Sequence, residues 1–392
     1  MNPLSNFQTI DKETLTELVR RAVQSETVEI GRYQVSQLAG GMGNPVSLGL
    51  YRFSGMGMDR DRPVAWSLIL KAIQSPANVG ETDMGEDDSH KSHWNYWRRE
   101  FLIYQSGWLE SLADGLVAPR CLGLTEQVGD LAWLWLEEIT DSYKGQWPLA
   151  RYALAARHLG RFNGAYLGGQ PLPTFPWLSR DFHHQWLNGF ARLLPSFFDS
   201  RHSTLWDHPF VLRRFPMPEA NGLRRFLAGR DRIAQALSHL PQTFCHRDAY
   251  PTNLMSRPGP NGQEQTVALD WGLAGVGPVG EDLAQLSFGA YMNLPDYERP
   301  QLEALLFDSY LDGLGEGGWT ADWRAVRLGL TASVVVRVGI FLLLLLNDTL
   351  GVDRPVAPDP EDVDSTAEVF PQETAAARFV MQMANEAADL VL

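Results

Sequence analysis

The chain has 392 residues, of which 44% are hydrophobic, and its formal net charge is −14. This length exceeds that of one ordinary single-core domain and suits an enzyme of two lobes. The acidic balance argues against nucleic acid as the main partner, because affinity for phosphate backbones comes from clusters of Lys and Arg.

The two cysteines, Cys121 and Cys245, lie far apart and match no metal-ligand spacing. Cys245 directly precedes His246, and we expect it to be a small buried residue. The segment up to Thr27 is polar and charged, unlike a signal peptide. We therefore expect a cytoplasmic protein of a reducing compartment, monomeric or homodimeric, with no membrane partner.

Residues 28–74 alternate apolar and polar positions and are interrupted by glycines, which predicts a meander of antiparallel strands. The loop 39–45 contains Gly41 and Gly43, and glycines let backbone amides approach a phosphate closely. A plain hairpin turn is the alternative, since the loop lacks a strict G-x-G-x-x-G pattern.

The predicted strand 65–73 carries a single lysine, Lys71, near its end. A helix is predicted over residues 94–112, after an acidic loop, and Glu100 on this helix is the natural partner for Lys71. Glu110 is the competing acid. A lysine at a strand end can also be a solvated terminus, so its role depends on the motifs further along the chain.

The last strands of the first lobe are predicted at 117–124 and 131–136. Glu137 and Ile139 follow, and we place the domain boundary here, with an N-terminal domain 1–138 and a C-terminal domain 139–392. Amphipathic helices are predicted beyond it, at 147–167, 186–198 and 222–240.

The sequence His246-Arg247-Asp248-Ala249-Tyr250-Pro251-Thr252-Asn253 has the form H-R-D-x-x-x-x-N, and Asp270-Trp271-Gly272 follows an apolar run. One carboxylate and one carboxamide thus share a short loop, and a second carboxylate follows. Phosphoryl transfer needs such a set: a carboxylate that orients the attacking hydroxyl and oxygen ligands for magnesium. Either motif alone arises by chance, but both together at this spacing predict a kinase.

The segment 328–346 is apolar and long enough to span a membrane. Arg337 sits at its centre, however, and the flanks carry no aromatic belt. We therefore expect a buried helix of the larger lobe, in which Arg337 needs a carboxylate partner inside the protein. A metal site at Asp181, His183 and His184 is disfavoured, because adjacent histidines point to different faces of a helix.

These motifs resemble those of the aminoglycoside phosphotransferase and choline kinase family of protein-kinase-like small-molecule kinases. Gly280-Glu281-Asp282-Leu283-Ala284 resembles the family's G-x-D-L-A stretch, and residues 250–255 resemble its H-P-G-N-I-L run. Arg247 stands where the family usually has Gly, and no A-P-E follows. The resemblance implies an α+β, bilobal protein-kinase-like fold, with a small antiparallel-sheet lobe and a larger, mostly helical lobe.

The resemblance also implies roles for single residues, with ATP or GTP and Mg²⁺ as the cofactors. Asp248 is then the catalytic base or hydroxyl-orienting group, and Asn253 and Asp270 hold magnesium. Lys71 neutralises the phosphates and is oriented by Glu100, while Gly41 and Gly43 let backbone amides approach the phosphates. Glu137 and Ile139 hold the adenine edge, and His246 and Asp282 support the loop. Glu281, beside Asp282, is expected to be a solvated acid.

The implied function is transfer of the γ-phosphate to a hydroxyl of a small molecule such as an aminoglycoside, another antibiotic, an amino sugar or an amino alcohol. The alternatives are a kinase-like scaffold without efficient turnover and a protein kinase. A cationic acceptor would suit the net charge, with carboxylates of 137–141 or of Asp359, Glu361, Asp362 and Asp364 binding its ammonium group.

Overall fold

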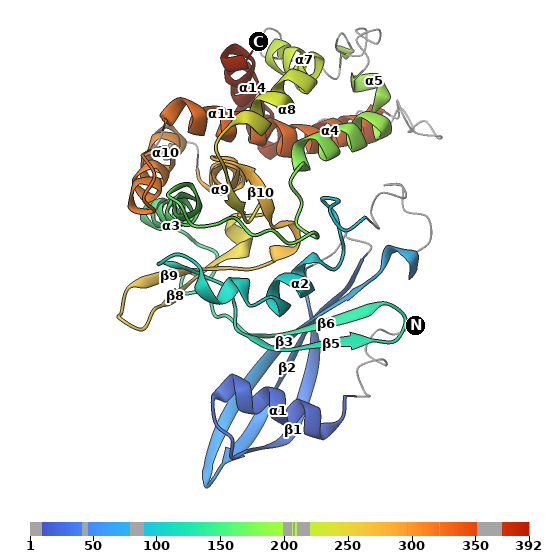
Figure 1. Cartoon of the computed structure of the whole chain (residues 1–392), viewed down its shortest axis with the longest axis vertical. Helices are drawn as coiled ribbons and strands as arrows, with labels where there is room; N and C mark the ends of the chain where they lie inside the picture. The colour runs from blue at the N-terminus through green and yellow to red at the C-terminus, as the bar shows by residue number, and fades with distance from the viewer. Residues whose placement is uncertain are drawn as a thin grey trace. The chain divides into compact units, whose positions relative to one another are not determined.

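The structure is a computed structural model that describes residues 10–40, 46–78, 90–198, 206, 208–209, 220–295, 297–320, 322–350 and 371–391. It consists of two compact units (Figure 1). The first comprises residues 1–91, 95–144 and 255–273, and the second comprises 92–94, 145–254 and 274–392. The division thus differs from a single boundary at 138/139, because a later hairpin belongs to the first unit.

The first unit is built on a five-stranded antiparallel sheet, as the alternating pattern predicted (Figure 1). Its strands, in spatial order, are β1 (Val28–Leu38), β2 (Ser47–Asp59), β3 (Arg62–Gln74), β6 (Leu131–Glu137) and β5 (Cys121–Gln127). β3 is therefore the central strand and pairs with β2 on one side and β6 on the other. Its position places Lys71 in the middle of the sheet.

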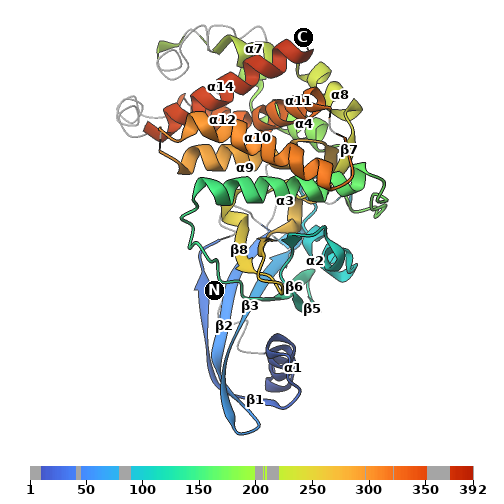
Figure 2. The same ribbon diagram turned by 90° about the vertical axis from the view of Figure 1, so that its left-hand side faces the viewer.

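Helix α1 (Lys12–Val23) packs against this sheet (Figure 2). Asp11 caps its first turn by accepting a hydrogen bond from the Thr14 backbone N–H at 2.7 Å. The buried face of the helix, with Leu15 and Val19, joins Trp66 and Leu68 of β3 in one core. Each such side chain contributes about 1.5–3 kcal/mol by leaving water, so α1 stabilises the strand that carries Lys71.

The helix predicted over 94–112 is shorter in the structure. It consists of α2 (Arg99–Gln105) and, after a break at Gly107, the 3₁₀ turn η4 (Trp108–Ser111). Gly107 has φ 70°, a left-handed conformation that ends a helix and that glycine adopts without a steric penalty. The apolar pattern in the sequence continued past this break because Phe101 and Tyr104 are buried in α2 and Leu109 is buried in η4.

The hairpin β8 (Leu254–Pro258) and β9 (Glu264–Ala268) belongs to the first unit because β9 pairs in parallel with β4 (Leu116–Val117). The 3₁₀ turn η7 (Trp271–Leu273) follows it directly. This pairing places Asp270-Trp271-Gly272 in the same unit as Lys71, although Asp270 and Lys71 are 199 residues apart in the sequence.

The second unit is mostly helical. It also contains one two-stranded antiparallel ladder, β7 (Gln242–Cys245) with β10 (Gly275–Pro278), and the 3₁₀ turn η6 (Pro251–Asn253). Its helices are α3 (Leu149–Leu167), α4 (Phe182–Leu193), α5 (Pro195–Phe198), α7 (Ala220–Ala228), α8 (Arg230–His239), α9 (Glu281–Asn293), α10 (Arg299–Glu316), α11 (Trp323–Val334), α12 (Ile340–Leu350) and α14 (Pro371–Val391). The predicted helix 222–240 is thus interrupted at Gly229, and the helix predicted from residue 186 begins four residues earlier.

The apolar segment 328–346 is a buried helix, as predicted. It runs through α11, a π-helical turn at Val335–Gly339 and α12. By length and composition alone Trp323–Leu344 could span a membrane. However, 83% of the most apolar 18-residue stretch of this helix is buried inside the protein. Arg337 lies in the π-helical turn with only 4% of its surface exposed.

Helices α3 and α10 pack side by side in the second unit (Figure 2). Glycines allow the close approach: a Cβ atom added at Gly160 would lie 2.2 Å from the Tyr310 carbonyl oxygen, and one at Gly313 would lie 2.1 Å from the Arg157 carbonyl oxygen. Both neighbours are backbone atoms, so neither can move without displacing a helix.

Replacing Gly313 by alanine is therefore expected to destabilise the protein by about 1–3 kcal/mol through overpacking. The matched control is Gly315→Ala in the same helix, where nothing lies within 4 Å of the added methyl group. That change should be neutral or stabilising by up to about 1 kcal/mol, since alanine favours helix over glycine. Urea-unfolding midpoints of both variants test this, and equal effects would contradict the close helix packing.

Candidate active site

In the first unit, Lys71 lies among two carboxylates. Its Nζ atom forms an ion pair with Glu100 of α2 and lies 2.9 Å from Oδ1 of Asp270. The side chains of Lys71 and Glu100 are 13% and 5% exposed. The structure thus pairs Lys71 with Glu100 and leaves the competing acid, Glu110, in η4.

The charge on Lys71 is held by these acids. Burial alone would lower the pKa of Lys71, but the carboxylates of Asp270 and Glu100 outweigh burial and raise the pKa above its ordinary value. The ammonium group therefore stays protonated although it is nearly buried. A fixed positive charge attracts an anion such as a phosphate group.

Asp270 adopts an unusual backbone conformation, with φ 60°. The left-handed region is uncommon for residues other than glycine and is held here by the turn that follows. The Trp271 indole is fully buried and donates to the Ala268 carbonyl at 2.9 Å, while Arg99 of α2 donates to the Gly272 carbonyl at 2.9 Å. The Asp270 side chain remains 47% exposed, so its carboxylate is presented at the surface of the unit.

The carboxylate of Glu137, at the end of β6, is fully engaged inside the unit. It accepts from the backbone N–H of Arg120 at 2.9 Å, from Nε of Arg120 at 2.8 Å and from Nη1 of Arg257 at 2.8 Å. Burial would raise the pKa of Glu137, but these hydrogen bonds outweigh it and the pKa is lowered. If Glu137 and Ile139 hold a nucleobase, they must use backbone groups.

The neighbouring acids have partners of their own. Glu138 forms an ion pair with Arg52, and Asp141 accepts from the Ser256 backbone N–H at 2.9 Å. The carboxylates of 137–141 are therefore bound to other groups of the protein, which argues against the prediction that they bind the ammonium group of an acceptor. Several predicted residues lie outside the described part of the chain, namely Gly41, Gly43, Asp359, Glu361, Asp362 and Asp364.

In the second unit, Asp282 holds the loop that follows β7. The carboxylate accepts from the backbone N–H groups of His246, at 3.1 Å, and Arg247, at 2.7 Å. His246 in turn accepts at Nδ1 from the Asp248 backbone N–H at 3.1 Å. His246 and Asp282 thus both accept hydrogen bonds from backbone N–H groups of this loop, and Asp282 is completely buried.

Two residues behind Asp282 were missed by the sequence reasoning. Asn163 of α3 donates from Nδ2 to Oδ2 of Asp282 at 3.0 Å, and the Tyr310 hydroxyl of α10 donates to Oδ1 of Asn163 at 2.7 Å. Both side chains are buried. No motif marks them, because a polar residue within an amphipathic helix carries no spacing signal.

Asp248 and Asn253 are joined by hydrogen bonds. The Asn253 Nδ2 atom donates to the Asp248 carbonyl at 3.0 Å and to Oδ2 of its side chain at 2.7 Å. Because the amide nitrogen faces Asp248, the amide oxygen is the Asn253 atom that can act as a metal ligand. The carboxamide of Asn253 and the carboxylate of Asp270 are both hard oxygen donors that fit Mg²⁺, which takes few protein ligands and completes its shell with phosphate and water.

No group of three or more His, Cys, Asp or Glu side chains that could hold a metal is found within the described ranges. The disfavoured metal site at 181–184 has other contacts instead. His183 is buried with Nε2 3.3 Å from the Ser333 hydroxyl, and His184 Nδ1 lies 2.9 Å from Oδ1 of Asp181.

The expectation that Glu281 is solvated is wrong. Its side chain is completely buried, and Oε1 lies 3.2 Å from Nε of Arg247, which is only 1% exposed. Arg247 also donates to the carbonyls of Ser179 and Val276 and lies over the Phe182 ring. The sequence showed an acid at the start of a helix, where solvation is common, and could not show the buried arginine opposite it.

Arg337 has the carboxylate partner that its burial required, and the partner is Asp248. The Nη2 atom of Arg337 lies 3.1 Å from Oδ1 of Asp248. The Asp248 side chain is 22% exposed, while that of Arg337 is 5% exposed. Asp248 therefore uses one oxygen for Arg337 and the other for Asn253.

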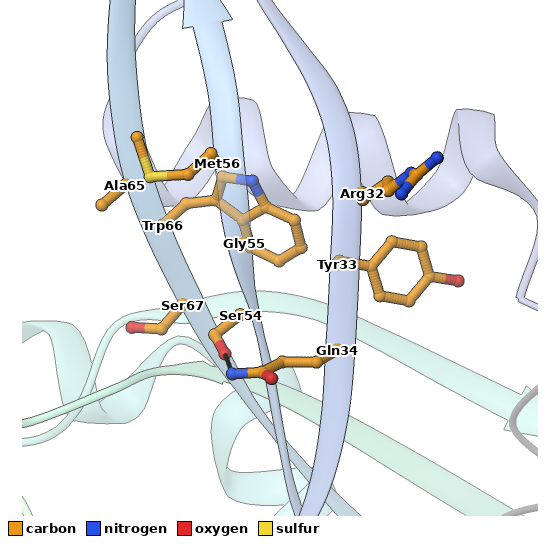
Figure 3. Close-up of a pocket in the computed structure, with 9 residues that line it drawn as sticks. All are labelled: Arg32, Tyr33, Gln34, Ser54, Gly55, Met56, Ala65, Trp66 and Ser67. Carbon is orange, nitrogen blue, oxygen red and sulfur yellow. Dashed lines mark hydrogen bonds between the residues drawn. The ribbon is translucent and has the colours of Figure 1, made fainter.

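A hollow of about 670 Å³ also lies on the hairpin part of the sheet in the first unit (Figure 3). Gln34 and Ser54 are joined across it by a 3.5 Å hydrogen bond. The residues that the sequence singled out do not line it. Its lining residues are Arg32, Tyr33, Gln34, Ser54, Gly55, Met56, Ala65, Trp66 and Ser67.

The sequence model of the phosphotransferase enzyme family, APH, matches residues 105–328, which is more than half of the chain. This match includes residues 246–253 with the H-R-D-x-x-x-x-N pattern, Asp270-Trp271-Gly272 and the Glu281–Asp282 pair. The protein therefore belongs to the phosphotransferase enzyme family, and its α+β, protein-kinase-like fold class is the one that the motifs predicted. A search of curated proteins finds no relative that matches.

Solved structures with a similar arrangement share little sequence with this chain. The amicoumacin kinase hAmiN, in complex with AMP-PNP, Ca²⁺ and amicoumacin, is 12% identical, with a TM-score of 0.48, over 99% of this chain and 96% of that one. Spectinomycin phosphotransferase APH(9)-Ia, in complex with ADP and spectinomycin, is 13% identical, with a TM-score of 0.48, over 96% and 100%. A microcompartment-associated aminopropanol kinase is 12% identical, with a TM-score of 0.47, over 95% and 98%. Family membership rests on the sequence match and not on these structures.

Removing one partner of the buried Arg247–Glu281 pair should be costly. Glu281→Gln leaves a buried guanidinium without its carboxylate, and we expect a loss of about 3–5 kcal/mol in the free energy of unfolding. The control is Asp389→Asn, which breaks an ion pair with Arg225 whose side chains are 69% and 47% exposed. That change should cost less than about 1 kcal/mol. Similar losses in chemical denaturation would refute the pair's importance.

The buried His183 should make stability depend on pH. Burial first, and then the charges of Arg247 and Arg337, lower the pKa of His183 to about 3. In the unfolded chain histidine titrates near about 6.5, so below that pH the unfolded state takes up a proton that the folded state excludes. Stability is thus full above pH ~6.5 and falls toward acid by up to about 1.4 kcal/mol per pH unit.

Unfolding free energies at pH 7.5 and 5.5 test this prediction. His183→Gln should reduce the loss between the two pH values by about 1 kcal/mol. His158, whose pKa is lowered to about 4 chiefly by burial, should keep its own contribution. His184→Gln, at the exposed neighbouring position, is the control for the substitution itself. Identical pH dependence of the unfolding free energy in the wild type, His183→Gln and His184→Gln would exclude His183 as a source of that dependence.

Proposed function

We propose that this protein transfers the γ-phosphate of ATP or GTP to a hydroxyl group of a small molecule. The observation that carries the proposal is the nearly buried ammonium group of Lys71, held between Glu100 and Asp270 in a chain of the phosphotransferase family. A charged lysine paired with a helix glutamate, beside the aspartate of the metal motif, is the arrangement by which protein-kinase-like enzymes neutralise nucleotide phosphates.

Within the first unit, Lys71 binds the α- and β-phosphates and Glu100 orients it. The backbone of Glu137 and Ile139 holds the adenine or guanine edge, since the Glu137 carboxylate is already occupied by Arg120 and Arg257. The expected role of Gly41 and Gly43 at the phosphates stays a prediction from the sequence, since both lie outside the described residues. These roles follow from residue chemistry and from the family to which the chain belongs.

Asn253 and Asp270 are the residues that would hold Mg²⁺ through oxygen. When bound, the ion neutralises phosphate charge and fixes the position of the transferring group. Asp270 keeps a partly exposed carboxylate, and Asn253 directs its amide oxygen away from Asp248. The donor set is all oxygen, which suits magnesium and disfavours zinc.

Asp248 orients the acceptor hydroxyl and accepts its proton. Both carboxylate oxygens are held, one by Arg337 and one by Asn253, so the group is fixed before the acceptor arrives. Positioning of this kind supplies most of the catalysis in phosphoryl transfer, because the protein has little covalent chemistry to perform.

The acceptor is a small hydroxylated molecule such as an aminoglycoside, an amino sugar or an amino alcohol. Arg247 is bound to Glu281 and to backbone carbonyls, so it is not available to pair with a phosphorylated activation segment in the manner of regulated protein kinases. A cationic acceptor stays a prediction, as does a cytoplasmic location. A catalytically weak scaffold is disfavoured, because the ion pairs and the loop hydrogen bonds are all intact.

Asp248→Asn is expected to reduce kcat by about 10²–10⁴-fold, since the hydroxyl loses the group that orients it and accepts its proton. Nucleotide affinity should stay close to that of the wild type. Release of ADP and GDP across a panel of hydroxylated small molecules, with a protein acceptor alongside, gives the rates. Calorimetry with Mg²⁺ and a non-hydrolysable nucleotide gives the affinities.

Asp181→Asn, an exposed aspartate of the same unit, is the matched control and should leave both quantities unchanged. In contrast, Asp270→Ala should weaken the binding of nucleotide with Mg²⁺. A wild-type protein that binds nucleotide but phosphorylates no small molecule would support the scaffold alternative. Turnover of Asp248→Asn near the wild-type rate would remove the assigned role of Asp248.

A further inference from the structure

Arg337 lies beside the catalytic loop but comes from a distant part of the chain. Its Nη2 atom lies 3.1 Å from Oδ1 of Asp248, and the two residues are 89 positions apart. The Arg337 side chain is 5% exposed, whereas that of Asp248 is 22% exposed. A buried cation therefore meets the one carboxylate of the loop that reaches the surface.

The π-helical turn Val335–Gly339 places this guanidinium. A π turn interrupts the regular backbone hydrogen bonds of a helix and often marks a functional position. Here the carbonyl of Val336 accepts from the indole N–H of Trp186 at 2.9 Å. The same Trp186 ring lies 4.8 Å from the Arg337 guanidinium carbon, and the Phe182 ring lies 5.3 Å from it. The turn thus carries the arginine and, through this hydrogen bond, holds one of the two rings that enclose it.

Arg337 makes few hydrogen bonds for a buried cation. Its Nε and Nη1 atoms are buried and have no hydrogen-bond partner in the part of the chain that the structure describes. The charge is balanced by Asp248, by the two ring faces and by Glu281, which lies within electrostatic range. Buried polar groups are nearly always hydrogen-bonded, so two buried donor atoms without a partner need an explanation.

We propose that Arg337 is a positioning residue for the reaction, holding the Asp248 carboxylate in the orientation that the acceptor hydroxyl requires. This inference rests on the proposed function. Oδ1 is held by Arg337 and Oδ2 by Asn253, so rotation of the carboxylate about its Cβ–Cγ bond is blocked from both sides. Because the guanidinium is enclosed by rings, it does not follow the carboxylate outward when acceptor binds.

The proposal predicts separate effects on kcat and KM. Arg337→Met should lower kcat by about 10²-fold, the cost of a misplacement near 1 Å. The KM for nucleotide should stay within about twofold, because the nucleotide-binding groups are untouched. Arg337→Lys keeps the charge but loses the planar contact with the rings, and its kcat should lie between those of the wild type and Arg337→Met.

Arg327→Met is the matched control. Arg327 lies ten residues earlier on α11 and pairs with Glu303 and Glu386, away from the catalytic loop. This variant should lose stability while keeping kcat. An equal kcat for Arg337→Met and wild type, or a loss of kcat in Arg327→Met as large as in Arg337→Met, would overturn the proposal.

A second variant guards against a misfolded Arg337→Met. Trp186→Phe keeps the aromatic ring and removes only the indole N–H that binds the Val336 carbonyl. Its kcat should fall about tenfold with nucleotide KM unchanged. Full wild-type activity in a folded Trp186→Phe would contradict the inference that the π-helical turn, through this hydrogen bond, positions Arg337. If the wild type itself transfers phosphate to no acceptor, the proposed function fails instead, and a crystal structure of Arg337→Met then shows whether the Asp248 carboxylate has turned.

Discussion

The second unit depends on the two carboxylates at the start of α9. Asp282 accepts hydrogen bonds from the backbone N–H groups of His246 and Arg247. Glu281 neutralises the side chain of Arg247. Both acids are completely buried, so each would be costly without its partner. The backbone of Arg247, at φ 67°, is kept in a left-handed conformation by these contacts. A strained loop of this kind persists only because the surrounding structure fixes it from several sides.

The buried charges of this unit are arranged in alternating sign. Arg247 meets Glu281, and Arg337 meets Asp248, while the neutral His183 lies within electrostatic range of both arginines. Such an arrangement contributes less to stability than an apolar core of the same volume, but displacing any of the elements that carry it would leave a charge without its partner. If Asp248 has its proposed role, that restriction bears on the reaction, because Asp248 is one of the charges it restricts.

In the first unit, Lys71 stays charged in the middle of a sheet although it is nearly buried. The carboxylates of Glu100 and Asp270 stabilise its charge. The parallel pairing of β4 with β9 makes this possible, since it brings the metal motif into the unit that carries Lys71. Membership of the phosphotransferase family and this retained charge together support an enzyme of small-molecule phosphorylation.

The sequence by itself determined the fold class and the family resemblance, because H-R-D-x-x-x-x-N, the D-W-G motif and the period-2 strands are local patterns, and the roles of single site residues stay predictions from those patterns. Even the need of Arg337 for a carboxylate could be predicted, since a charge in an apolar run must be paired. Only the tertiary structure decided that this partner is Asp248, that Glu281 is buried against Arg247, and that Asn163 and Tyr310 stand behind Asp282. Those contacts join residues 34 to 147 positions apart, and no spacing in a single sequence encodes which distant helix faces will meet.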